Sequence, residues 1–467
     1  MRASHLAAAL SLCLTIPTAV YAQSVVNSVT TGAANPEVEP LLTPTTPTER
    51  SQTVTVGVTL GMGETDNVGE TSDKRSQTLA LAGLDFGWIR TGSALEANVA
   101  GNFNYVEYVE GAYSAQLLAR FDGTTSLSLF DDHLKWYLQD DFGEGQLNPF
   151  LSATPTNLEQ VNVVTTGPEV TLRPLSDTVL QLGARYSQTS YQTSPLDGSR
   201  AAENLLLEHL LSGNSNVGLG AELEQLKFDD KSVNEDYDRS RFYLRYELGG
   251  AHTHITTLVG ETQSNDGGSW AATPFVKIDL AHDLSQRTSL AVTAGRELTD
   301  ASDAFTDVRG GAAGGIAVAA APLTTADYLR NYISAGLQAT GRQTTIGATA
   351  YWERDTYAVD NTFNVTRGII ELRAGRQLSA AISADIFTTI MRSQYFTQDA
   401  DINTYAVGAD IKWQASRTLS VAGRYFHNTQ STPGTDFGYS SNLIFVTVTY
   451  RPLLSDQTQQ LFPSQQQ

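Results

Sequence analysis

The sequence predicts an all-β protein: a transmembrane antiparallel up-and-down β-barrel of about 20 strands, of the kind found in bacterial outer membranes. Three observations predict it. Apolar and polar side chains alternate with a two-residue period between residues 52 and 450, short turns alternate with longer polar links, and an export signal begins the chain. A sheet that crosses lipid must close on itself, because hydrocarbon offers no partner to an open edge. Its strands then alternate apolar-outward with polar-inward residues.

The composition excludes several other classes of protein. The chain has 467 residues, with 30 Lys plus Arg against 50 Asp plus Glu, and a formal net charge of −20. Nucleic-acid binding needs clustered basic residues, so this acidic balance argues against a nucleic-acid partner. The apolar fraction of 41 % is low for a helical membrane protein, and no run after residue 22 is long enough for a transmembrane helix.

The first 22 residues have the pattern of a secretory signal peptide. Arg2 supplies the positive start, residues 6–20 form the apolar core, and Val20-Tyr21-Ala22 is a small-x-small cleavage site. Cleavage after Ala22 removes Cys13, the only cysteine, so we expect no disulfide and no cysteine metal site in the remainder. Residues 23–51 are expected to be a disordered periplasmic lead-in, and the Gln-rich residues 451–467 a disordered C-terminal tail.

The alternation defines the strands in order along the barrel domain, residues 52–450. Every second residue from Val54 to Met62 is apolar, and the last strand ends in an apolar set that closes with Tyr450, as suits recognition by the barrel-assembly machinery. The predicted number of strands is 20, within an allowed range of roughly 16–22. An even number puts the N-terminus and the C-terminus of the barrel on the same, periplasmic side. The predicted strands are 52–62, 76–90, 94–107, 114–121, 124–138, 158–173, 178–191, 201–212, 215–228, 238–249, 252–262, 270–282, 286–298, 326–340, 343–356, 363–376, 379–394, 402–414, 417–429 and 438–450.

The connections between these strands alternate in length. Short periplasmic turns are expected at such sites as 122–123, 174–177, 213–214 and 341–342, where Gly, Pro, Asn or Asp interrupts the pattern. Residues 301–325 are assigned to an external loop, because the Gly and Ala run within them offers lipid little apolar surface. The long external loops are expected at 63–75, 140–157, 192–200, 229–236, 301–325, 358–362 and 430–438.

Several charged residues fall on the polar, inward-facing parity of their strands. One interpretation is that they solvate the lumen and pair with neighbouring strands, each pair contributing a few tenths to about 1 kcal/mol. The other is that they form a selectivity field for a charged solute. These candidates are Arg185, Glu222, Glu224, Arg245, Glu247, Lys277, Asp279, Glu371, Arg373, Asp385, Asp410, Lys412 and Arg424.

The loop expected at 140–157 has the most restricted backbone, with two prolines and two asparagines. It could fold inward as a constriction, or it could be an ordered external loop that caps the rim. The candidate constriction residues are Asp140, Asp141, Phe142, Asn148, Pro149 and Phe150.

Motifs for an enzyme or a metal site are weak. No G-x-S-x-G nucleophile motif occurs. His252 and His254 form an H-x-H pair, but the sequence supplies no evident third ligand. Acidic residues crowd several loops without the spacing of a calcium-binding loop. We therefore expect no enzyme, no metal and no cofactor.

The same loop carries a family resemblance. Asp-x-Phe-Gly at 140–143, Asn-Pro-Phe at 148–150, Pro-Thr-Asn at 155–157 and Thr-Asp-Asn at 65–67 resemble segments of one bacterial family. That family comprises the outer-membrane β-barrels associated with exopolysaccharide and exosortase (PEP-CTERM) gene systems, including the porin-2-like barrels. The resemblance implies a large barrel with a role in polysaccharide secretion or surface assembly, and it transfers no catalytic or ligand residues. The Gln-rich tail departs from the family pattern.

The sequence thus predicts an outer-membrane barrel acting as a porin-like channel or conduit, linked to exopolysaccharide export or envelope assembly. The alternative is a non-conducting structural or docking barrel that binds a surface polymer or a secretion partner, and a third hypothesis is an enzyme acting on lipid or glycan. The expected partners are outer-membrane lipid and lipopolysaccharide, the barrel-assembly machinery, and exopolysaccharide or its secretion proteins.

Overall fold

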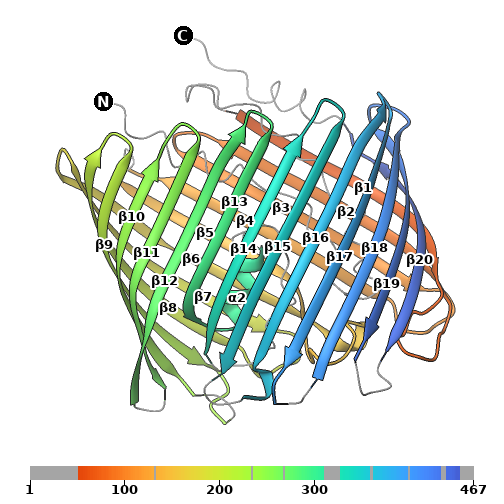
Figure 1. Ribbon diagram of the computed structural model, residues 1–467, viewed down its shortest axis with the longest axis horizontal. Helices are drawn as coiled ribbons and strands as arrows, with labels where there is room; N and C mark the ends of the chain where they lie inside the picture. Colours follow the sequence, from red (N-terminus) through yellow and green to blue (C-terminus); the bar gives the residue numbers. More distant parts are fainter. Residues whose placement is uncertain are drawn as a thin grey trace.

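The computed structural model describes residues 51–452, apart from 131–132, 233–234, 267–268, 310–326, 358–360, 398–399 and 433–437. The predicted signal peptide, most of the lead-in and nearly all of the tail lie outside the described residues. Within these residues the chain forms one sheet of 20 antiparallel strands (Figure 1). The strands are β1 (Ser51–Thr65), β2 (Gln77–Thr91), β3 (Leu95–Tyr108), β4 (Gln116–Ser128), β5 (Leu134–Gln146), β6 (Leu158–Leu175), β7 (Thr178–Tyr191), β8 (Gly198–Ser212), β9 (Ser215–Phe228), β10 (Tyr237–Gly249), β11 (Thr253–Asp266), β12 (Ser269–Ser285), β13 (Thr288–Thr299), β14 (Tyr328–Thr340), β15 (Thr344–Tyr357), β16 (Val365–Ser379), β17 (Ile382–Tyr395), β18 (Ala400–Gln414), β19 (Leu419–Ser431) and β20 (Tyr439–Tyr450).

The sheet closes into a barrel. Each strand pairs with its neighbours in sequence, and β1 pairs with β20 in a register that runs from Val58↔Tyr450 to Thr65↔Leu443. Closure gives both edge strands a partner, which a sheet in hydrocarbon requires. The predicted all-β barrel of about 20 strands is therefore confirmed.

The two faces of the sheet differ as the alternation predicts. In β20 the residues Ile444, Val446, Val448 and Tyr450 are each about half exposed, and the residues between them are buried. The same holds around the barrel, where Leu60 and Ile386 are 62 % and 61 % exposed. This outward face is apolar, and the opposite face points into the barrel.

Among the described residues, no helix is long and apolar enough to cross a membrane.

The turn predicted at 122–123 is wrong. β4 continues through Asp122 and Gly123, and the connection to β5 lies at 129–133. Asp-Gly is a common turn signal, but here Asp122 faces inward and pairs with Arg120 at 2.8 Å, so it is accommodated within a strand. β5 is shifted accordingly and extends to residue 146, so the external loop spans 147–157 rather than 140–157.

The long link predicted at 301–325 contains a helix that the sequence analysis did not anticipate. This helix, α2 (Ala301–Arg309), follows β13 and lies inside the barrel (Figure 1). Two single-turn 3-10 helices also occur in loops, η2 (Pro155–Asn157) and η3 (Asn361–Phe363). The periodic signal for α2 was present, because Ala301, Ala304, Phe305 and Val308 have the i, i+3, i+4, i+7 spacing of a helix face.

Part of the inner wall is apolar, which corrects the expectation of a polar lumen on every strand. On β1, Gly61 and Gly63 face inward, and a Cβ at either position would meet the ring of Phe445 from β20. Because these β1 residues have no side chain, large side chains of the flanking strands β2 and β20 can pack together over the inner face of β1. Glycine and aromatic residues pair in the same way in curved sheets. Val68 from the first external loop joins them. The cluster comprises Val68, Leu79, Leu81, Val106, Tyr108, Leu118, Phe387, Ala406, Phe426, Leu443 and Phe445.

Candidate functional site

The structure places all the predicted lumen charges on inward-facing parity. Strand registers bring many of them to an opposite charge: Arg239 lies directly across from Glu224, and Arg241 from Glu222. Their ion pairs measure 2.5 and 2.9 Å. Further pairs that include predicted lumen charges are Arg185–Glu169, Arg245–Glu208, Arg245–Glu247, Arg373–Asp385 and Arg424–Asp410. Lys277, Asp279, Glu371 and Lys412 lie on the same inward face.

This pairing decides what the wall does electrostatically. Most inward arginines have a carboxylate within 4 Å, so much of the wall charge is neutralised locally. Pairs of this kind on neighbouring strands stabilise the sheet. The selectivity role of these residues stays a prediction.

The candidate constriction residues divide between β5 and the loop. Asp140 and Phe142 share the parity of the exposed Trp136 and Leu138, so they lie on the outward face of β5, and Asp141 lies on the inward face. These three residues are therefore not part of a loop. Asn148, Pro149 and Phe150 do belong to loop 147–157.

Loop 147–157 reaches the opposite wall of the barrel. It leaves the ring between β5 and β6, and its Phe150 ring lies 4.6 Å, centroid to centroid, from Tyr395 at the end of β17. Phe150 also stacks on Phe363 at 6.2 Å. These partners stand about half-way round the 20-strand ring from β5 and β6. The loop therefore crosses the mouth of the lumen.

The restricted backbone of the loop comes from its asparagines. The Asn157 side chain accepts the Asn148 amide and donates to the carbonyl groups of Asn148 and Ser152. Asn148 in turn accepts the amide of Phe150. The Ser152 hydroxyl donates to the Glu70 carbonyl of the first external loop, which ties the two loops together. The loop thus holds a defined shape as it crosses.

α2 is the second segment that enters the lumen. Asp300 precedes it and accepts the amides of Ser302 and Asp303, as an N-cap residue does. Phe305 packs on Val161 and Val163 of β6, and Ala304 packs on Tyr328 and Tyr357 of β14 and β15. The helix therefore touches two separated parts of the wall.

A cluster of buried charges fixes the start of α2 to the wall. Arg200 of β8 contacts Asp300 at 2.5 Å and also pairs with Asp303. Arg239 of β10 contacts Asp303 at 2.7 Å, and the Tyr237 hydroxyl donates to Asp300 at 3.2 Å. Burial alone would raise the pKa of Asp303, but the two arginines outweigh it and hold this pKa well below its usual range.

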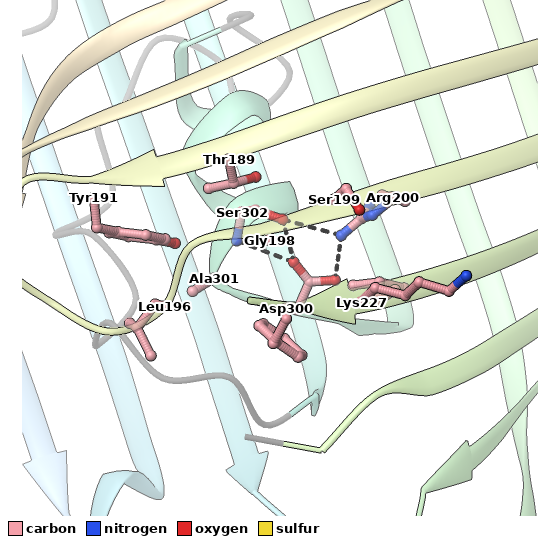
Figure 2. A pocket seen from close by; sticks show the side chains of 12 residues that line it. Thr189, Tyr191, Leu196, Gly198, Ser199, Arg200, Lys227, Asp300, Ala301 and Ser302 are labelled. Carbon is pink, nitrogen blue, oxygen red and sulfur yellow. Dashed lines mark hydrogen bonds and ion pairs between the residues drawn. The ribbon is translucent and has the colours of Figure 1, made fainter. Parts of the chain in front are cut away.

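A pocket opens beside this cluster on the inner side of β7 to β9. Residues that line it include Thr189, Tyr191, Leu196, Arg200 and Asp300 (Figure 2). Arg200 and Asp300 therefore form part of the pocket lining, although both side chains are mostly buried. Sequence reasoning missed Arg200, Arg239, Asp300 and Asp303, because only the fold brings β8, β10 and the loop after β13 together.

The described residues contain no group of three His, Cys, Asp or Glu side chains that could hold a metal ion. His254 of the predicted H-x-H pair lies 3.8 Å from Glu247 and close to Thr256.

Among known proteins, similarity was found only to solved structures. No family model and no curated protein matches the chain. Among solved structures, the siderophore receptor PirA from Acinetobacter baumannii shares 10 % identity over 86 % of this chain and 81 % of that chain, with a TM-score of 0.48. OccAB3 from Acinetobacter baumannii shares 9 % over 86 % and 99 %, with a TM-score of 0.38. OmpT from Vibrio cholerae, as a loop L8 deletion mutant, shares 11 % over 86 % and 99 %, with a TM-score of 0.34. Because these identities and TM-scores are low, we infer the function from the contacts within this chain and not from these structures.

Proposed function

We propose that the protein is a porin-like channel of the bacterial outer membrane that passes small polar solutes through an aperture set by loop 147–157 and α2. The observation that carries the proposal is the contact of Phe150 with Tyr395 across the mouth of a closed barrel. A segment that crosses the lumen leaves gaps on either side of it, and the width of these gaps decides which solutes pass.

The proposed location in the outer membrane follows from the apolar side chains on the outward face of the barrel. Large apolar side chains such as Leu60, Ile386 and Ile444 point away from the barrel and are more than half exposed. A soluble protein rarely exposes so much apolar surface, whereas lipid requires it. The export signal predicted in residues 1–22 supports the same location.

The mechanism is passive diffusion. Polar and charged side chains on the inner wall replace part of the hydration shell of a solute as it passes. Most wall arginines are paired with carboxylates, so the excess of acidic residues sets the overall field. We therefore expect a mild preference for cations.

The experiment is conductance in planar lipid bilayers. We expect stepwise conductance and, in a salt gradient, a reversal potential of the sign that cation selectivity gives. Replacing residues 148–156 with a short Gly-Ser linker should raise the single-channel conductance. Absence of conductance in both proteins would refute the channel, and clear anion selectivity would reject the argument from acidic residues.

The envelope process is the finer part of this proposal. On the family resemblance, we propose that the channel serves exopolysaccharide export or a related step of envelope assembly. A polymer would have to displace both crossing segments, so this role requires a partner or the polymer itself to move them. A strain lacking the gene should release less exopolysaccharide to its surface. An unchanged amount would remove the polysaccharide link and leave the channel proposal intact.

A docking barrel that conducts nothing is the second candidate. The observation that favours it is the filling of the lumen from two directions, by loop 147–157 and by α2, together with the apolar cluster beside β1. This candidate predicts no conductance in the wild type or in the loop-replacement variant, and it predicts co-purification with a secretion protein.

A further inference from the structure

We propose that Arg200, Arg239 and Tyr237 form an anion-binding site on the inner wall, and that Asp300 and Asp303 of the α2 segment occupy it as an internal substitute for a solute with two acidic groups. The inference deepens the proposed function, because it names a class of solute that the lumen would bind. Transport of that solute rests on the proposed function. Its first support is the partner set of Arg200. Both ion pairs of Arg200 within the described part of the chain go to Asp300 and Asp303.

The strands give Arg200 no carboxylate directly across from it, and Glu224, the carboxylate on β9 that acts on it from a diagonal position, already pairs with Arg239. The register partners of Arg200 are Ser187 on β7 and Leu226 on β9, neither of which carries a charge. Arg239 differs, because Glu224 lies directly across from it and pairs with it. The side chain of Arg200 is only 12 % exposed. With the helix elsewhere, two buried guanidinium groups would share the single carboxylate of Glu224. Unbalanced buried charge is strongly unfavourable, so the site then favours another anion.

A solute could displace α2 from the arginine site. It has nine residues, a length at which a helix is marginal in water without tertiary contacts. Its presence at the wall therefore depends on the same ion pairs that a solute would compete for, together with the packing of Ala304 and Phe305. The pocket beside Arg200 and Asp300 offers an approach to the pair (Figure 2).

The geometry defines the class of ligand. Asp300 and Asp303 are three residues apart at the start of a helix, which places their Cβ atoms roughly 5–6 Å apart. These carboxylates are contacted by two guanidinium groups and by one phenol hydroxyl. A short dicarboxylate such as glutarate presents two acidic groups at a comparable separation, and guanidinium groups bind carboxylates through paired, charge-assisted hydrogen bonds.

The first test is calorimetric titration of the purified barrel in detergent with glutarate. Replacing Asp300 and Asp303 with Asn removes the two negative charges that compete for the arginines, so the double variant should bind glutarate at least tenfold more tightly than the wild type. Adding Arg200→Gln should abolish that gain. The matched control is Arg392→Gln, which removes an outward arginine that pairs with Asp401 and is 62 % exposed. A double variant that binds no better than the wild type would overturn the site, as would a gain that survives Arg200→Gln.

The second test leaves the charged cluster intact, in case the double variant does not fold. Residues 23–467 contain no cysteine, so Ala304→Cys introduces a single thiol on the buried face of α2, where Ala304 is 4 % exposed. Glutarate should speed the labelling of this thiol by a maleimide, and its neutral dimethyl ester should not. A labelling rate that glutarate leaves unchanged throughout a titration would refute the competition. Both tests work without a voltage, so they can succeed or fail independently of the channel proposal.

Discussion

Phe150→Ala should loosen loop 147–157 from the opposite wall and raise the time-averaged conductance. The substitution removes two aromatic contacts, one to Tyr395 at 4.6 Å and one to Phe363 at 6.2 Å. Each such pair contributes roughly 0.5–1.5 kcal/mol beyond area burial, so the two ring pairs alone account for about 2 kcal/mol of docking energy. That loss changes the ratio of docked to undocked loop by a factor of about 30. A loop undocked for about 1 % of the time would become undocked for roughly a quarter of it.

The assay is single-channel recording with measurement of the open-time fraction in the larger conductance state. The matched control is Phe130→Ala, which truncates an exposed ring in the turn after β4 and should leave the recording unchanged. The Asn148 and Asn157 hydrogen bonds remain in the variant, so the loop should keep its local shape. If Phe150→Ala and Phe130→Ala give the same conductance as the wild type, the loop does not control the aperture.

Three further predictions concern stability and pH. Arg367→Met leaves the buried carboxylate of Glu353 without its guanidinium partner, so it should lower the free energy of unfolding by about 3–5 kcal/mol, measured from the urea midpoint of heat-modifiable migration in gels. Gly63→Val places a side chain against the ring of Phe445 and the Ile444 carbonyl group and should reduce the yield of folded barrel, whereas normal yield would contradict the packing described. Because the pKa of Asp303 is lowered in the folded protein, its ion pairs contribute fully above the ordinary carboxylate pKa of about 4 and are lost as the pH falls towards the folded value. Conductance should therefore stay constant from about pH 8 to pH 5, and opening near pH 6 would show that another group holds α2.

The closed sheet could be predicted because its signal is local. Lipid acts on every strand in the same way, so each strand records its outward face in its own residues, as Ile444, Val446 and Val448 do in β20. The boundaries were less secure where one residue type serves two purposes. Asp122 and Gly123 have the composition of a turn, yet the inward pairing of Asp122 with Arg120 keeps them in β4.

The contents of the lumen could not be predicted in the same way. The sequence identified loop 147–157 as conformationally restricted, but the identity of its partner depends on which strands stand opposite it in a ring of 20. The contact between Phe150 and Tyr395 joins residues 245 positions apart in the chain (395 minus 150). Likewise, nothing in the vicinity of Arg200 indicates that its partners lie 100 residues away at the start of α2.

The sequence by itself determined the class of fold, the approximate number of strands and the face that each strand turns outward, because the environment imposes these features residue by residue. Only the tertiary structure decided that a loop and a helix enter the barrel and that two arginines meet two aspartates there. Those features depend on the closure of the ring, which brings distant parts of the chain within contact distance.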